Sequence, residues 1–176
     1  MTSTVAIHTI GHSTRSADEF LRLLNVHGIT QVADIRTVPR SGRYPHFNRD
    51  QLEAWLAANG IAYRHFAALG GLRKPRPDSL NSAWRNPGFQ GYADHMQTGE
   101  FRKGVDALLA FAAAGPTCAM CAEAVWWQCH RRLLSDSLLV RGVPVRHILT
   151  EAEAKPHERS EFAKEVGGQL TYPGLL

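Results

Sequence analysis

The stretch that decides the fold runs from Thr117 to Arg132 and has the sequence TCAMCAEAVWWQCHRR. It begins as a short apolar run, typical of a buried strand, and ends as the first turn of an amphipathic helix. The turn between them carries five reactive or charged side chains: Cys121, Glu123, Cys129, His130 and Arg131. In an open α/β sheet, ligands bind in the crevice beyond the carboxyl ends of the strands. We therefore predict a functional site at this turn.

Outward from that turn, β-prone runs alternate with helices that end in glycine. Beside the run at 117–120, such runs lie at 5–10, 30–35, 61–65 and 143–149. A capping-box pattern at Ser16–Glu19 opens a helix that stops before Gly28. Repeated helix–glycine–strand units imply parallel pairing through crossover connections. We predict one α/β domain over residues 1–150, with three layers, a mostly parallel sheet of about five strands and helices on both faces.

Two segments do not follow this alternation. Residues 66–99 contain scattered glycine and proline without strong periodicity, which predicts a long, lid-like loop that is mobile over 70–88. Residues 151–176 form a C-terminal extension that packs on the domain or trails from it, with a short helix expected near 159–166.

Composition narrows the class of protein. The chain has 176 residues, 44% of them hydrophobic and 20% charged, which is ordinary for a globular domain. Since no apolar run approaches the roughly 20 residues of a membrane span and the first ten residues lack a signal-peptide pattern, we expect a cytoplasmic protein without membrane contact. The net charge of +4 favours a small anionic ligand or nucleic acid as partner. Three cysteines do not suggest a disulfide framework.

Polar side chains follow each of three strands that we expect to be neighbours. They come after the first strand, after the second and after the run at 117–120, so they converge on one edge of the sheet. The candidate catalytic residues are Cys129, Cys121, Glu123, His130 and His12. The candidate substrate-binding residues are Ser13, Arg15, Asp34, Arg36, Arg40, Ser41 and Arg131.

Several of these residues also have a purely structural interpretation. Ser13 is suited to cap a turn and His12 to make local loop contacts. Asp34 and Arg36 lie on one face of an extended run and can form a structural pair. Glu123 can be the ion-pair partner of Arg131. Their convergence still favours a functional site.

The remaining cysteine, Cys118, has the two-residue spacing from Cys121 of a zinc knuckle. In a regular strand, however, side chains three positions apart point to opposite faces. We therefore interpret Cys118 as a core residue and expect no metal and no cofactor. Trp126 and Trp127 are expected to serve packing.

Several short blocks follow one another in order along the chain: Thr9-Ile-Gly-His-Ser13, Asp34-Ile-Arg36, Pro39-Arg-Ser41, Phe47-Asn48, Leu69-Gly-Gly71, Gly88-Phe-Gln-Gly-Tyr-Ala93 and Cys121-Ala-Glu…Cys129-His-Arg131. In these blocks the chain resembles domain-of-unknown-function family 488 (DUF488). The resemblance implies an α/β fold in a prokaryotic family with no assigned activity. The family pattern usually has a proline where this chain has Trp126, which affects the start of the following helix.

Three functions fit these observations. The first is a thiol-dependent hydrolase or transferase, in which Cys129 or Cys121 attacks an anionic substrate and His130 or His12 moves protons. The Cys-x₅-Arg loop of thiol phosphatases is absent, because Trp127 follows Cys121 at that spacing. The second is a nucleotide-binding or nucleic-acid-binding protein without catalysis, using loop arginines interleaved with Tyr44, Phe47, Trp84 and Tyr92. The third is a redox protein that pairs Cys121 with Cys129.

Cys129 is the strongest single candidate. The positive end of a helix dipole, the fixed charge of Arg131 and protonation of His130 each lower the pKa of a nearby thiol. Burial under Trp126 and Trp127 would raise it. We predict that the charges dominate and that the pKa of Cys129 is depressed.

Overall fold

The protein is built on one central sheet, which the computed structural model describes within residues 5–174. Its strands are β1 (Ile7–Gly11), β2 (Gln31–Asp34), β3 (Ala62–His65), β4 (Thr117–Cys121), β5 (Val145–His147) and β6 (Lys155–Pro156). They lie in the order β3-β2-β4-β1-β5-β6, and every pairing is parallel except that of β5 with β6. The predicted α/β class is confirmed, with a six-stranded sheet.

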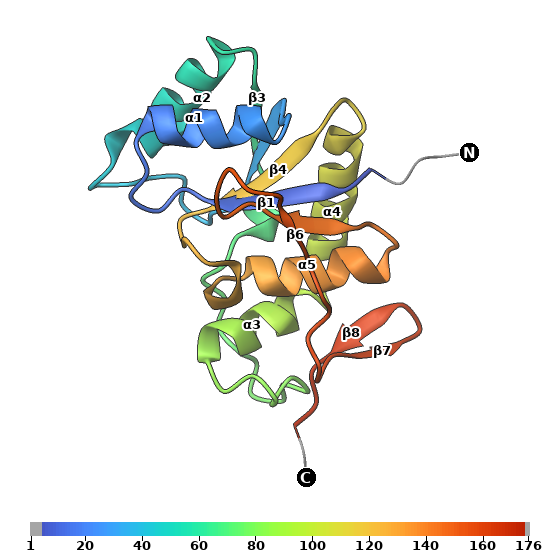
Figure 1. Cartoon of the computed structure of the whole chain (residues 1–176). Coiled ribbons are helices and arrows are strands. Elements are labelled where there is room, and N and C mark those ends of the chain that lie inside the picture. The colour runs from blue at the N-terminus through green and yellow to red at the C-terminus, as the bar shows by residue number, and fades with distance from the viewer. Residues whose placement is uncertain (1–4, 175–176) are drawn as a thin grey trace.

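Helices cover both faces of this sheet (Figure 1). Helices α1 (Ala17–Val26) and α2 (Arg49–Ala57) lie on one face, while α3 (Pro87–His95), α4 (Gly99–Ala112) and α5 (Arg131–Val140) lie on the other. Each face has its own buried apolar cluster, one centred on Phe20 and Leu52 and the other on Phe101 and Leu134. The three-layer arrangement predicted from the sequence is therefore present.

Strand β4 shows how the sequence separates the two faces. All five of its residues are buried, as expected of a central parallel strand. Cys118 and Met120 belong to the cluster under α1 and α2, whereas Ala119 and Cys121 belong to the cluster under α3, α4 and α5. Cys118 thus lies on the opposite face from Cys121, as the period of two requires, and serves as a core residue.

The local signals at helix ends are also found in the structure. Ser16 caps α1 with a complete capping box to Glu19. Gly28, Gly60 and Gly142 follow α1, α2 and α5 with φ of +68°, +74° and +77°, a conformation in which glycine avoids the strain of a side chain. No helix within the described part of the chain has the length and apolar character needed to cross a bilayer.

The order of the strands brings three carboxyl ends together. β4 lies between β2 and β1, with Asp34 opposite Met120 and Gly11 opposite Cys121. The turn after β4 approaches β1 very closely at Gly11, where an added Cβ would lie 1.6 Å from the carbonyl oxygen of Glu123. The turn after β4 is therefore held directly against the end of β1.

The segment 66–99 is more regular than the sequence predicts. It contains a short 3-10 helix at Ala67–Leu69 and the helix α3. Asn86 caps α3 by accepting hydrogen bonds from the N–H groups of Gly88 and Phe89, and Pro87 occupies the first helical position. The middle of the segment is fixed to α3, because the Asp94 carboxylate accepts hydrogen bonds from three groups: Arg76 N–H, Ser79 Oγ and Asn81 Nδ2.

The C-terminal extension packs on the domain through strands instead of the expected helix. β6 extends the sheet beside β5, and β7 (Lys164–Val166) pairs antiparallel with β8 (Gln169–Thr171). The prediction of a helix near 159–166 is wrong. Gly167 and Gly168, both at positive φ, form the two-residue turn that favours a hairpin here.

Candidate functional site

A pocket of about 330 Å³ lies at the carboxyl ends of β2 and β4. Its walls come from four segments: the end of β4 with the turn before α5, the loop after β2, the glycine pair at 70–71 with Leu72, and the start of α3. Six of the predicted site residues line it: Arg36, Arg40, Cys121, Glu123, Cys129 and His130. This position matches the crevice expected for an α/β sheet.

Two thiols meet at the base of this pocket. The Sγ atoms of Cys121 and Cys129 lie 2.7 Å apart, and both residues are free cysteines with little exposure. The Cys121 Sγ also lies 3.7 Å from the carbonyl oxygen of Glu123. Either thiol can be the donor in the contact between the sulfurs, and the Cys121 S–H can also donate to this carbonyl.

Cys129 does not lie in the first turn of a helix, which corrects the sequence prediction. Trp126–Gln128 form a short 3-10 helix, Cys129 follows it in an extended conformation, and α5 begins at Arg131. The helix still acts on the sulfur, since the backbone N–H of Arg131 donates to Cys129 Sγ at 3.4 Å. The expected dipole effect is therefore delivered by the first N–H of α5.

His130 is oriented by main chain on one side and faces the thiol on the other. Its Nε2 donates to the carbonyl oxygen of Ile35 at 2.8 Å, and its Nδ1 lies 3.5 Å from Cys129 Sγ. Gly71 packs directly on the ring, because a Cβ there would lie 3.0 Å from Nδ1. The imidazole thus has little freedom to rotate away from the sulfur.

Arg131 is buried and binds the turn after β4 from the core side. Its Nη2 donates to the carbonyl oxygen of Glu123 at 2.7 Å, and its Nη1 donates to Thr9 Oγ1 at 3.1 Å. The side chains of Glu123 and Arg131 do not form the ion pair of the alternative, structural interpretation, because the acceptor is the main-chain carbonyl and the Glu123 side chain is exposed at the pocket. Since Arg131 has no exposed surface, it acts on the thiols and not directly on a ligand.

The two thiols differ in their ease of ionisation. Burial raises the pKa of Cys121, and the neighbouring Cys129 raises it further. Burial by itself also raises the pKa of Cys129. Three neighbours outweigh this effect and hold the Cys129 pKa well below its usual value: the Cys121 thiol, His130 and Arg131. Cys129 is therefore the thiolate of the pair and Cys121 the proton donor.

The sequence model described as Domain of unknown function DUF488 matches residues 16–138, well over half of the chain. The chain belongs to this family. No curated protein and no solved structure gave a match. The family description assigns no biochemical activity.

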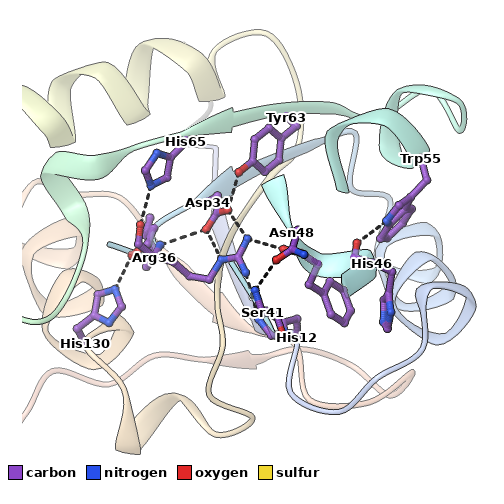
Figure 2. A network of polar contacts seen from close by, with 12 residues as sticks. His12, Asp34, Arg36, Ser41, His46, Asn48, Trp55, Tyr63, His65 and His130 are labelled. Carbon is purple, nitrogen blue, oxygen red and sulfur yellow. Dashed lines mark hydrogen bonds and ion pairs between the residues drawn. The ribbon is translucent and has the colours of Figure 1, made fainter. Parts of the chain in front are cut away.

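In this DUF488 protein the Asp34-Ile-Arg36 block forms a second polar centre beside the pocket (Figure 2). Arg36 donates from Nε and Nη2 to the two carboxylate oxygens of Asp34 at 2.9 and 2.7 Å, and both side chains are buried. Tyr63 donates to Asp34 at 2.6 Å, and Arg36 Nη2 also donates to the carbonyl of Phe47. The charge of Arg36 is thus neutralised inside the protein.

His12 belongs to this second centre and not to the thiol pair. Its ring stacks on Phe47, Nδ1 contacts the Ser13 carbonyl at 3.0 Å, and Nε2 lies 3.4 Å from Arg36 Nη1. Burial lowers the pKa of His12 to about 4, so the ring is neutral at neutral pH. Nothing in this geometry places His12 against Cys129, so its role in proton transfer stays a prediction.

The remaining predicted binding residues form two groups, one that lines the pocket and one that lies outside it. Arg40 is exposed and lines the pocket, and the described residues include no ion-pair partner for it. Ser13, Arg15 and Ser41 lie outside the pocket. Arg15 donates to the carbonyls of Gly11 and Leu149, and Ser41 accepts from the Tyr44 N–H. The Ser41 contact is local, whereas Arg15 joins the loop after β1 to the residues that follow β5.

Some pocket residues have no clear signal in the sequence. Val38 and Leu72 are exposed apolar side chains on the pocket wall, 56% and 85% exposed. Leu72 has a φ of +52°, which is strained for a branched residue. The start of α3 also reaches the pocket and was predictable in part, because Asn86-Pro87 is a typical helix start.

Three of the four aromatic residues of the base-stacking hypothesis are buried, and the fourth, Tyr44, is half-buried. Phe47, Trp84 and Tyr92 are buried in the core, where they cannot meet a base. Arg40 is exposed on the pocket wall, and binding of nucleic acid stays an untested alternative. Within residues 5–174, no cluster of three or more His, Cys, Asp or Glu side chains is arranged to hold a metal ion.

Proposed function

We propose that this DUF488 protein is a thiol-dependent enzyme, a hydrolase or transferase in which Cys129 attacks an electrophilic centre of an anionic substrate. One observation carries the proposal. At the base of a pocket, Cys129 Sγ meets the Cys121 thiol at 2.7 Å, the Arg131 N–H at 3.4 Å and His130 Nδ1 at 3.5 Å. A nucleophile, a base and an orienting group in such contact are the usual components of nucleophilic catalysis.

His130 is suited to be the base because its tautomer is dictated by Ile35. A carbonyl oxygen can only accept, so Nε2 carries the proton and the Nδ1 lone pair faces Cys129. Transfer of the thiol proton to Nδ1 gives a thiolate beside an imidazolium. The buried Arg131 and the Cys121 S–H then stabilise the negative sulfur.

The chemistry balances for an ester or a related acyl substrate. The Cys129 sulfur forms a bond to the carbonyl carbon, and the bond from that carbon to the leaving oxygen breaks. The proton held on His130 Nδ1 passes to the leaving oxygen. Water or another acceptor then attacks the thioester and restores the free thiol.

Arg40 is the group that supports an anionic substrate. Arg36 is already paired with Asp34, whereas Arg40 is exposed on the pocket wall. The apolar side chains of Val38 and Leu72 lie on the same wall. A substrate with one anionic group and an apolar or aromatic part fits these contacts, and nucleotide derivatives are one such class.

A chromogenic acyl ester tests this proposal. Mixing the protein with p-nitrophenyl acetate should give a burst of p-nitrophenolate, with the acetyl group located on Cys129 by mass spectrometry. Cys129→Ser should abolish the burst. Cys118→Ser should keep it, because Cys118 lies on the opposite face of β4. Acetylation spread evenly over the cysteines would contradict the proposal.

A second candidate function is reversible thiol oxidation. The contact between Cys121 and Cys129 favours it, because two thiols so close can form a disulfide with little movement. The pair would lose two electrons and two protons to a disulfide oxidant such as oxidised glutathione, which is reduced to two thiols.

One variant separates the two candidates. Cys121→Ser keeps a hydrogen-bond donor beside Cys129, so the acyl burst should survive, whereas intramolecular oxidation becomes impossible. Equilibration in glutathione redox buffers followed by thiol counting would show whether the wild-type pair oxidises as a unit. A burst that survives in Cys121→Ser favours the acyl-transfer enzyme.

A further inference from the structure

A chain of buried hydrogen bonds leads away from the thiol site toward the C-terminal segment. It starts at Arg131 Nη1, which contacts Thr9 Oγ1 at 3.1 Å. Thr9 Oγ1 lies 2.6 Å from His147 Nδ1, and His147 Nε2 lies 2.9 Å from His157 Nδ1. His157 Nε2 then lies 2.7 Å from a carboxylate oxygen of Asp136. A buried cation and a buried anion are thus joined through three intervening side chains.

The chemistry of the two ends favours one direction for the bonds in this chain. Arg131 can only donate, so Thr9 accepts from it, and the Thr9 hydroxyl proton is free to donate to His147 Nδ1. Asp136, as a carboxylate, can only accept, so His157 carries its proton on Nε2. His157 Nδ1 then accepts from His147 Nε2. With these proton positions, all four bonds point from Arg131 toward Asp136.

Burial makes this chain costly to break. Thr9, Arg131, Asp136 and His147 are at most 1% exposed, and His157 is 6% exposed. Burial also lowers the pKa of His147 to about 2, which agrees with a neutral ring. Removal of one link would leave buried donors or acceptors without partners, and such groups are expensive in a low-dielectric interior.

The chain of hydrogen bonds also contacts the turn that carries Cys129. The indole of Trp126 stacks on the His147 ring, with centroids 4.4 Å apart and planes 5° from parallel. Trp126 begins the 3-10 helix that leads to Cys129. His147 therefore supports the thiol site twice, through Arg131 and through Trp126.

We infer that this chain positions the Arg131 guanidinium against the thiol pair, making Thr9, His147, His157 and Asp136 positioning residues of the site. The inference rests on the proposed function, since it concerns the reactivity of Cys129. It gives the C-terminal segment a role, because His157 lies there and Asp136 is further held by Ser160 N–H and Tyr172 OH. Thr9, His147 and His157 all lie outside residues 16–138, so the family match alone does not include them.

Two variants of Thr9 test the inference. Thr9→Val has a similar shape and suits a strand, but it leaves Arg131 Nη1 without its acceptor. The pH midpoint of Cys129 alkylation by iodoacetamide should rise by about half a unit or more, as a less firmly held cation stabilises the thiolate less well. Thr9→Ser keeps the hydroxyl and should restore the wild-type midpoint. Tyr172→Phe, which removes a donor to Asp136 without interrupting the chain, should lower the melting temperature and leave the midpoint in place.

The outcomes separate this inference from the proposed function. A wild-type Cys129 that alkylates like an ordinary thiol would overturn the proposed function. A depressed wild-type midpoint that is unchanged in folded Thr9→Val would overturn the positioning role alone. The direction of the chain is tested without any variant by ¹⁵N NMR of the imidazoles, where both His147 and His157 should carry the proton on Nε2. A proton on Nδ1 of either ring would refute it.

Discussion

The sulfur atoms of Cys121 and Cys129 lie 2.7 Å apart at the base of the pocket, although seven residues separate them in the sequence. β4 ends at Cys121, and the 3-10 helix at 126–128 turns the chain back so that Cys129 returns to the strand end. The two sulfurs share a buried space but have different neighbours. Cys129 alone contacts His130 and the first N–H of α5. This asymmetry decides which thiol ionises.

The contact predicts different effects for two substitutions of Cys121. Cys121→Ala removes the donor to the Cys129 thiolate, so the pH midpoint of Cys129 alkylation should rise by about one unit. Cys121→Ser retains an O–H donor and should shift the midpoint less. Mass-spectrometric alkylation profiles measure both. Equal profiles for Ala and Ser would show that the Cys121 thiol does not act by donating a hydrogen bond.

Arg40 should provide the attraction for anions. Inorganic phosphate is expected to protect Cys129 from iodoacetamide, because an anion on the pocket wall excludes the reagent. Arg40→Gln should weaken this protection by about tenfold in phosphate concentration. Arg43→Gln is the matched control, since Arg43 is also exposed but does not line the pocket. Equal loss of protection in both variants would assign the effect to general surface charge.

The fold could be predicted from short-range signals, and the site only in part. Alternating strands and glycine-terminated helices were enough to predict parallel strands whose carboxyl ends meet, and with them Cys121 and Arg36 at one edge. Helix α3 was missed because Gly88 and Gly91 lower its intrinsic helix propensity. Gly91 is present for packing, since a Cβ there would lie 2.1 Å from the Arg73 carbonyl oxygen.

The contacts that were missed depend on residues far apart in sequence. One interpretation paired Arg131 with the Glu123 carboxylate, but Arg131 donates to the main-chain carbonyl of that residue, in the turn that packs on Gly11. The link from Thr9 to His147 spans 138 positions. No local pattern marks such a pair, because each residue alone resembles an ordinary strand residue.

Asp94 should control the order of the segment before α3. It accepts hydrogen bonds from the backbone N–H of Arg76 and from the side chains of Ser79 and Asn81. Asp94→Asn loses the charge and part of this acceptor capacity, so amide exchange in 76–81 should accelerate by about tenfold or more. Asp78→Asn is the control, because Asp78 is exposed and pairs only with Arg76. Exchange in wild-type 76–81 that is already as fast as in an unfolded chain would contradict this anchoring.

His12 should make stability depend on pH. Its pKa is lowered from 6.5 to about 4, mainly by burial, so the unfolded chain binds the proton more readily than the folded protein. The stabilisation is therefore complete above about pH 6.5 and is lost as the pH falls toward 4. His12→Gln removes this titration, and the loss of unfolding free energy between pH 7 and pH 4.5 should shrink by about 2 kcal/mol. Urea unfolding at both pH values measures it, and an unchanged loss would show that His12 is not the group responsible.

The glycine pair at 70–71 offers the sharpest test of His130. A Cβ on Gly71 would lie 3.0 Å from His130 Nδ1 and 3.4 Å from Cγ, so the imidazole must move. The ring can keep its hydrogen bond to the Ile35 carbonyl only if Nδ1 tilts away from Cys129. Gly71→Ala should therefore slow alkylation of Cys129 at neutral pH by about tenfold, which corresponds to one unit in the thiol pKa.

Gly42→Ala is the matched control for this substitution. Gly42 has open space around the added methyl, and neither glycine has a positive φ, so alanine is compatible with the backbone at both positions. Both variants should fold, and Gly42→Ala should be slightly more stable than wild type because the unfolded chain loses freedom. Its Cys129 should react at the wild-type rate. If Gly71→Ala is folded and also reacts at the wild-type rate, then His130 does not set the reactivity of Cys129, and the base must be sought elsewhere in the pocket.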